Sequence, residues 1–152
     1  MLAEGKPSRL EESLKRFHQV LTDADRREIL AVQDKPLPTG IRLNGLKVDP
    51  ERAIQEMAAR FGWQTTPVPF CNHAWAIKQA ESSPGRTIEH RMGQYYLQDV
   101  ASMVPVSLIN FEKAPATPLI LDMAASPGGK TTHLIDRSGD LGFVIANDAS
   151  KG

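Results

Sequence analysis

Apolar residues in the first third of the chain recur at the spacing of helices. A first helix is predicted after Ser8, which together with Glu11 fits a capping box. A second short helix is predicted to begin near Thr22 or Asp23. The apolar face of the first helix follows three- and four-residue intervals, at Leu10, Leu14, Phe17 and Leu21. We therefore expect two short helices before the proline-rich connection at 35–40.

The next part of the chain has the pattern of a strand, a helix and two more strands. Segment 41–44 alternates apolar and polar residues, as a half-buried strand does. The residues Asp-Pro-Glu at 49–51 suit the start of a helix, and Gly62 suits its end. Further strands are predicted at 64–68 and 74–78. This order indicates a small α+β domain.

A loop is predicted to separate this domain from a second one. Residues 79–90 contain Ser-Ser-Pro-Gly and lack a regular apolar pattern. We therefore place the first domain at 1–90 and the start of the second at 91–152.

A helix is predicted within residues 95–111, a stretch that contains Pro105. If Ser102 caps this helix, Pro105 falls in the first turn, where a missing amide costs little. The side chains expected to pack on a sheet are Val104, Leu108 and Phe111.

A strand, a tight turn and a helix are predicted around the sequence Pro127-Gly128-Gly129. The apolar run at 119–122 ends in small residues, and a helical pattern resumes through His133. In an open α/β sheet, nucleotide-like ligands bind beyond the carboxyl ends of the strands. Gly128 and Gly129 would let a ligand approach the backbone, and the first amides of the helix could meet its polar atoms.

A second buried strand, at 143–146, is followed by Asp148. Asp148 lies about twenty residues beyond the glycines, where doubly wound folds place the carboxylate that binds ribose hydroxyls. Glycines and carboxylate in this register favour a ribose-bearing cofactor. The alternative is an ordinary turn followed by a solvated strand end.

The segment Gly129-Lys130-Thr131 also matches the end of the phosphate-binding loop of nucleoside triphosphatases. Ala124 stands at the position of the first glycine of that motif, and Pro127 removes a backbone amide from the loop. Because a triphosphate cradle relies on such amides, a nucleotide-triphosphate binder is the lesser alternative.

The composition is that of an ordinary globular protein with no global basic excess. The formal net charge of the 152 residues is zero, so any contact with RNA would need a local patch. The single Cys71 excludes an intramolecular disulfide and suits a reducing cytoplasm. Cys71 and His73 have no second pair of ligands nearby in the sequence, so no metal site is expected. The sequence shows neither a secretory leader nor a long apolar run, so no membrane association is expected.

Three segments resemble the RNA cytosine-5 methyltransferases of the Sun/nucleolar-protein family. Segment 122–134, Asp-Met-Ala-Ala-Ser-Pro-Gly-Gly-Lys-Thr-Thr-His-Leu, resembles the cofactor motif of that family. Segment 93–103 resembles the part that precedes the cofactor strand, and segment 41–47 resembles the Arg-x-Asn-x-Leu-Lys strand. The three segments occur in the order of the family and are spread over most of the chain, from residue 41 to residue 134.

This resemblance implies an α/β and α+β architecture, in which a small RNA-recognition-like domain precedes the first part of a Rossmann-like domain. It also implies S-adenosylmethionine as the cofactor and RNA as the partner, with ribosomal RNA as the expected target of cytosine-5 methylation. Lys130 would lie near the methionine carboxylate or a neighbouring acid. The cofactor-binding residues would be Ala125, Ser126, Pro127, Gly128, Gly129, Lys130, Thr131 and Asp148.

The resemblance carries no catalytic residue over to this chain. Cytosine C5 must gain electron density from a nucleophile at C6, and the family uses cysteines in Pro-Cys and Thr-Cys motifs beyond the cofactor loop. Cys71 matches neither motif and is expected to be an ordinary, partly buried thiol. The chain is thus expected to be the N-terminal part of a methyltransferase and inactive alone. An RNA-binding or docking module that does not bind cofactor is the alternative.

Two groups of residues in the first domain keep open roles. Arg42, Asn44 and Lys47 could face RNA, or they could hold this domain against the next one. Trp63 and Trp75 are expected in the core or at an interface, because no aromatic strand of the RNA-recognition type is present.

Overall fold

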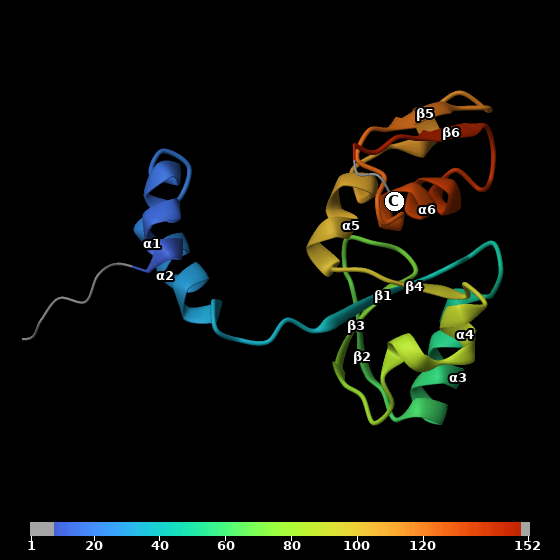
Figure 1. The fold of residues 1–152 in the computed structure, drawn as a ribbon, viewed down its shortest axis with the longest axis horizontal. Helices are drawn as coiled ribbons and strands as arrows, with labels where there is room; N and C mark the ends of the chain where they lie inside the picture. The colour runs from blue at the N-terminus through green and yellow to red at the C-terminus, as the bar shows by residue number, and fades with distance from the viewer. Residues whose placement is uncertain (1–7, 150–152) are drawn as a thin grey trace, which may run out of the picture. The chain divides into compact units, whose positions relative to one another are not determined.

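The structure, a computed structural model, describes residues 8–149. It contains two compact units, Met1–Leu37 and Pro38–Gly152 (Figure 1). In the described residues no helix is long and apolar enough to cross a lipid bilayer. The candidate site belongs entirely to the second unit.

The first unit contains the two short helices that the sequence predicts. They are α1 (Arg9–Leu14), which continues into the 3-10 helix η1 (Lys15–Phe17), and α2 (Asp23–Val32). Ser8 Oγ accepts the amide of Glu11 at the start of α1, which confirms the predicted capping box. Thr22 caps α2 in the same way.

The second unit begins with a four-stranded antiparallel sheet in the order β2-β3-β1-β4. Its connectivity is strand-helix-strand-strand-helix-strand, the ferredoxin-like arrangement. The elements in chain order are β1 (Thr39–Leu43), α3 (Pro50–Phe61), β2 (Gln64–Pro67), β3 (Ala74–Gln79), η2 (Pro84–Arg86), α4 (Ile88–Arg91) and β4 (Tyr95–Leu97).

The predicted caps of α3 are confirmed. The carboxylate of Asp49 accepts the amides of Glu51 and Arg52, and Pro50 occupies the first turn, where its missing amide costs nothing. Gly62 ends the helix in the left-handed conformation, at φ 63°.

The alternation of residues along β1 divides the sheet into two different faces. Ile41 and Leu43, both fully buried, point into an apolar core beneath α3. Arg42, between them, points to the opposite face, as the period of two requires. Trp63 and Trp75 lie in the core, as predicted. The other core members are Ala53, Ile54, Met57, Ile77 and Tyr95.

A second sheet contains the parallel pair β5 (Leu119–Asp122) and β6 (Phe143–Ala146), joined by α6 (Gly129–Arg137). Helices α5 (Val100–Ser107) and α6 lie between this pair and the four-stranded sheet (Figure 1). The fold class is therefore confirmed: a mixed α/β chain with an antiparallel sheet followed by the start of a Rossmann-like domain.

The outer face of the parallel pair is apolar and exposed. Its side chains are between 54 and 74% exposed, at Leu119, Leu121, Phe143 and Ile145. Ile120 and Val144, which alternate with them, are partly buried on the inner side. Parallel sheets are normally covered on both faces, so this face has the character of an internal surface.

The prediction of a helix with Ser102 as its cap is wrong. Residues 95–97 form β4, and the helix begins at Val100 with Asp99 as its cap. Pro105 consequently lies inside the helix rather than in its first turn. The helix turns Met103 and Val106 inward, whereas Val104 and Leu108 are exposed, so the predicted packing face is also wrong.

The predicted loop at 79–90 contains two short helical segments, η2 and the beginning of α4. The helical turns are too short to show an apolar period. The division of the chain at residue 90 stays a prediction, and β4, which completes the four-stranded sheet, lies a few residues beyond that position.

Gly40 allows β1 to pass close to the segment that follows β4. A Cβ atom on Gly40 would collide with the carbonyl oxygen of Gln98, a backbone atom that cannot move aside. We expect Gly40→Ala to lower the free energy of unfolding by about 1–3 kcal/mol, measured by urea titration. Gly85→Ala is the control, because its Cβ would meet only the flexible side chain of Leu97 at 3.3 Å. Equal stability of the two variants would contradict this view of Gly40.

Candidate functional site

Asp122, the last residue of β5, holds the two sides of the loop that follows it. Its Oδ1 accepts the amide of Ala124 at 3.1 Å, and its Oδ2 accepts the hydroxyl of Thr131 at 2.6 Å. The side chain is buried, so both hydrogen bonds are shielded from water. Asp122 thereby fixes where the loop leaves the strand and where α6 begins.

The end of β6 binds the same loop from its other side. The amide of Ala125 donates to the carbonyl of Asn147 at 3.0 Å, and the amide of Asn147 donates to the backbone carbonyl of Asp122 at 2.8 Å. Asp148 then accepts the amide of Ser126 through Oδ2 at 2.8 Å. The predicted carboxylate and the predicted loop are therefore adjacent, as the register of the two parallel strands requires.

The two glycines serve different purposes at the start of α6. Gly128 has φ 107°, a conformation that residues with side chains rarely adopt, and its amide donates to Ala125 O at 2.6 Å. Gly129 is buried, and a Cβ there would lie 3.3 Å from the ring of Tyr96. Gly128 thus makes the turn possible, whereas Gly129 allows the four-stranded sheet to approach the loop.

The arrangement of these residues fits a nucleoside cofactor. Small side chains at Ala124 and Ala125 and the turn at Gly128 leave backbone atoms open to a ligand, and Asp148 supplies a carboxylate at the adjacent strand end. The predicted segment Ala125–Thr131 and Asp148 are brought together around one turn. The roles of these residues in binding, including that of Lys130, stay predictions.

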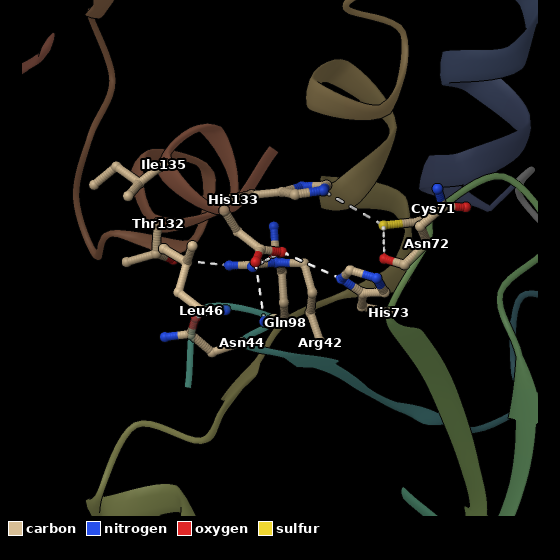
Figure 2. Close-up of polar contacts among 12 residues, drawn as sticks. Arg42, Asn44, Leu46, Cys71, Asn72, His73, Gln98, Thr132, His133 and Ile135 are labelled. Carbon is tan, nitrogen blue, oxygen red and sulfur yellow. Dashed lines mark hydrogen bonds and ion pairs between the residues drawn. The ribbon is translucent and has the colours of Figure 1, made fainter. Parts of the chain in front are cut away.

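Arg42 is a buried cation that joins the four-stranded sheet to α6 (Figure 2). It is 2% exposed, and its guanidinium donates to Thr132 Oγ1 at 2.8 Å and to Gln98 Oε1 at 3.2 Å. A longer bond reaches the carbonyl of Gly129 at 3.4 Å. Asp136 lies 3.5 Å away and supplies the opposite charge. Burial lowers the pKa of Arg42 from its usual value, and Asp136 opposes that shift.

These contacts decide between the two roles left open for Arg42. A side chain that is nearly inaccessible to solvent cannot face RNA, so Arg42 holds the sheet against α6. Asn44 also has a structural role, since its side-chain amide donates to Gly93 O at 3.3 Å. Lys47 is exposed and donates to Met92 O at 2.8 Å.

Asp136 receives contacts from two loops of the four-stranded sheet. The amide of Gly45, after β1, donates to Asp136 Oδ1 at 3.0 Å. His73, between β2 and β3, places its Nδ1 3.7 Å from Asp136 Oδ2. The Asp136 side chain is only 7% exposed and therefore has little water to stabilise its charge. Arg42, 3.5 Å away, supplies the balancing positive charge.

His133 lies on the inner side of α6 and is 1% exposed. Its Nε2 is 3.6 Å from the thiol of Cys71, and its Nδ1 has no hydrogen-bond partner among the described residues (Figure 2). Burial, followed by the charges of Arg42 and Arg137, lowers the pKa of His133 to about 3. The imidazole is therefore neutral. Cys71 is fully rather than partly buried, at 3% exposed.

The sequence analysis gave no role to several contributors to the site, among them Asp122, Tyr96 and Gln98. Asp122 stood inside a recognised motif, and its position at a strand end before small residues was a usable signal. Tyr96 bonds to Pro127 and Gln98 accepts from Arg42, and these partners are far away in sequence, so no local pattern could reveal the contacts. In residues 8–149 no group of three or more His, Cys, Asp or Glu side chains could hold a metal ion.

Two family models match the chain. Residues 11–100 match the family model of the N-terminal domain of 16S rRNA methyltransferase RsmF, and residues 111–152 match that of 16S rRNA methyltransferase RsmB/F. Ribosomal RNA small subunit methyltransferase F of Shewanella piezotolerans is 37% identical over 125 residues, which cover 81% of this chain and 26% of that protein. The enzyme of the same name from Shewanella halifaxensis is 33% identical over 152 residues, covering 88% and 32%.

A solved structure supports the fold. The crystal structure of a methyltransferase homologue from Pyrococcus horikoshii superposes with a TM-score of 0.77 at 28% identity, covering 92% of this chain and 44% of that one. The chain thus spans about a quarter to a third of the length of the curated relatives named above.

We expect Arg42→Gln to lower the free energy of unfolding by about 3–5 kcal/mol, because it leaves Asp136 charged and buried without its partner. The measurement is urea unfolding followed by circular dichroism. Arg52→Gln is the matched control, since Arg52 pairs with Glu56 at 2.7 Å on an exposed helix face. Its unfolding midpoint should stay at the wild-type value. A similar, small effect of both substitutions would contradict the role given to Arg42.

His133 predicts a loss of stability in acid. Its pKa is about 3 in the folded chain and near 6.5 when unfolded, so the unfolded state binds more protons below pH 6.5. The stabilisation is complete above pH 6.5 and is lost as the pH falls toward 3. By pH 5 the loss in the free energy of unfolding is about 2 kcal/mol. His133→Gln should flatten the pH dependence of the free energy of unfolding over this window. Parallel pH profiles of variant and wild type would contradict the prediction.

Proposed function

The chain belongs to the 16S rRNA methyltransferase RsmB/F family, and from this premise we propose that it is the N-terminal part of an S-adenosylmethionine-dependent methyltransferase that makes 5-methylcytosine in ribosomal RNA. The first part, to about residue 90, would be the RNA-recognition-like domain, and the remainder would begin the Rossmann-like domain. The expected location is the cytoplasm. The exposed apolar face of β5 and β6 supports the proposal, because further elements of a larger Rossmann-like domain would cover it.

The observation that carries the proposal is the convergence of two carboxylates on one loop. Asp122 and Asp148 follow two adjacent parallel strands, and both bind backbone or hydroxyl groups of the loop between β5 and α6. Ligands of doubly wound folds bind at this edge of the sheet.

Different residues of the chain would bind different parts of S-adenosylmethionine. Asp148 would accept hydrogen bonds from the ribose hydroxyls, and Lys130 would lie near the methionine carboxylate. The backbone from Ala125 to Thr131 would surround the remaining polar atoms. When bound, the cofactor supplies an electrophilic methyl group. No catalytic residue is assigned in this chain, because the buried Cys71 contacts His133 and is closed to a substrate base.

An RNA-docking module that does not bind cofactor is less well supported. RNA-recognition motifs stack bases on aromatic residues of their central strands. Here the corresponding face of β1 and β3 presents Arg42 and Ala74, and α5 and α6 cover it. RNA would therefore have to bind elsewhere on the unit, so the RNA-recognition-like fold alone does not argue for an RNA-only function.

A nucleoside triphosphate is also disfavoured. The Asp148 carboxylate binds the Ser126 amide in the middle of the loop, where a phosphate would be required. A triphosphate would have to displace this carboxylate and would be repelled by it. Pro127 contributes no amide to replace the lost contact.

The test is calorimetric titration of S-adenosylmethionine into the full chain, with Asp148→Asn as the variant. Asparagine keeps the size of the side chain and an oxygen for the Ser126 amide, but it loses the charge and one acceptor. We expect about ten-fold or greater weakening of cofactor affinity, because hydrogen bonds to charged groups contribute about 1.5–3 kcal/mol.

Asp34→Asn, in the first unit, is the matched control and should bind as the wild type does. Mg²⁺-ATP should give no heat of binding. Failure of a folded wild-type chain to bind S-adenosylmethionine, or unchanged affinity in Asp148→Asn, would oppose the proposal. Affinity for an RNA oligonucleotide without affinity for the cofactor would favour the docking module.

A further inference from the structure

Tyr96, on β4 of the four-stranded sheet, reaches the loop before α6. Its hydroxyl donates to the carbonyl of Pro127 at 2.9 Å, across 31 residues of sequence. Pro127 directly precedes Gly128, the residue whose positive φ creates the turn. A hydrogen bond at this point restrains the peptide unit that joins the two residues.

The ring of Tyr96 also sets how closely the sheet approaches the loop. Its Cε1 lies 3.3 Å from the position of a Cβ on Gly129, and the amide group of Gln98 lies 3.4 Å from the same position. Gln98 is in turn held by Arg42 through its Oε1. The loop is therefore packed against β4 and the residue that follows it.

The residues that hold the loop thus come from three elements. Asp122 and Asp148 hold the loop from the ends of β5 and β6, and Tyr96, on β4, hydrogen-bonds to the carbonyl of Pro127. Arg42, on β1, reaches the carbonyl of Gly129 just beyond the turn. The Pro127–Gly128 peptide has a fixed orientation only if both sides of the loop are held.

From this geometry we infer that Tyr96 is a positioning residue for the cofactor loop, so that the RNA-recognition-like sheet contributes to the affinity for S-adenosylmethionine without contacting the cofactor. The inference rests on the proposed function. Tyr96 acts by restricting the loop to the conformation that binds, which lowers the ordering cost of binding.

The neighbouring Tyr95 provides a matched control on the same strand. Its side chain points to the opposite face of the sheet, where its hydroxyl contacts Thr87 and the carbonyl of Pro84. Tyr95 is 2% exposed, and its ring packs against Trp63 and His90. Burial raises the pKa of Tyr95, which therefore stays neutral. Each Tyr→Phe change removes one hydroxyl and keeps the ring.

The experiment compares wild type, Tyr96→Phe and Tyr95→Phe in the full chain by three measurements. These are the dissociation constant of S-adenosylmethionine, the urea unfolding midpoint, and amide hydrogen exchange of Ser126, Gly128 and Gly129 without cofactor. Tyr96→Phe should weaken cofactor binding about three- to ten-fold, the loss of one hydrogen bond. It should also speed exchange of the loop amides. Tyr95→Phe should lower the unfolding midpoint and leave the affinity and the loop exchange unchanged.

The outcomes distinguish a failure of the role given to Tyr96 from a failure of the proposed function. Unchanged affinity in Tyr96→Phe, with a wild type that binds, would overturn the inference alone. Weaker affinity with unchanged loop exchange would also overturn it, because Tyr96 would then act by direct contact. A wild type that binds no cofactor would oppose the proposed function, and unaltered exchange in Tyr96→Phe would then overturn the positioning role as well.

Discussion

The second unit is organised around the buried charge of Arg42. A guanidinium that is 2% exposed is stable only where acceptors and an opposite charge surround it. The partner charge, Asp136, and the acceptor Thr132 both lie on α6, whereas Arg42 itself lies on β1. Separating the sheet from α6 would expose both charges to water or leave each one buried without its partner. The four-stranded sheet and the start of the Rossmann-like part are therefore held as one unit, despite their different architectures.

This constraint changes what the four-stranded sheet can do. In an RNA-recognition motif, helices cover one face and the other face binds bases. Here α3 covers the apolar face, and α5 and α6 cover the second one. Small residues at Gly40 and Ala74 permit that close packing. The surface that RNA-recognition motifs offer to RNA is used within this chain to support the loop between β5 and α6.

Local signals in the sequence were sufficient for most elements and for the loop itself. Caps at Ser8, Thr22 and Asp49 located three helices, and the glycines with Asp148 located the candidate site. The prediction failed for β4, because a three-residue strand is too short to show a period and its apolar residues join those of the following helix. The partners of Arg42 and Tyr96 could not be predicted either, since each contact spans 31 or more residues.

The loop between β5 and α6 illustrates how a short segment can be fixed without a large core of its own. Four of its six residues, 123–128, are exposed, so burial of the loop's own side chains contributes little to its conformation. Its shape depends instead on four hydrogen bonds to side chains from separate elements, two made by Asp122 and one each by Asp148 and Tyr96. Restraints from independent elements limit the conformations of the loop more than a single contact would. Folding of the sheets then pays the entropy of ordering the loop before any ligand arrives, which is the physical meaning of preorganisation.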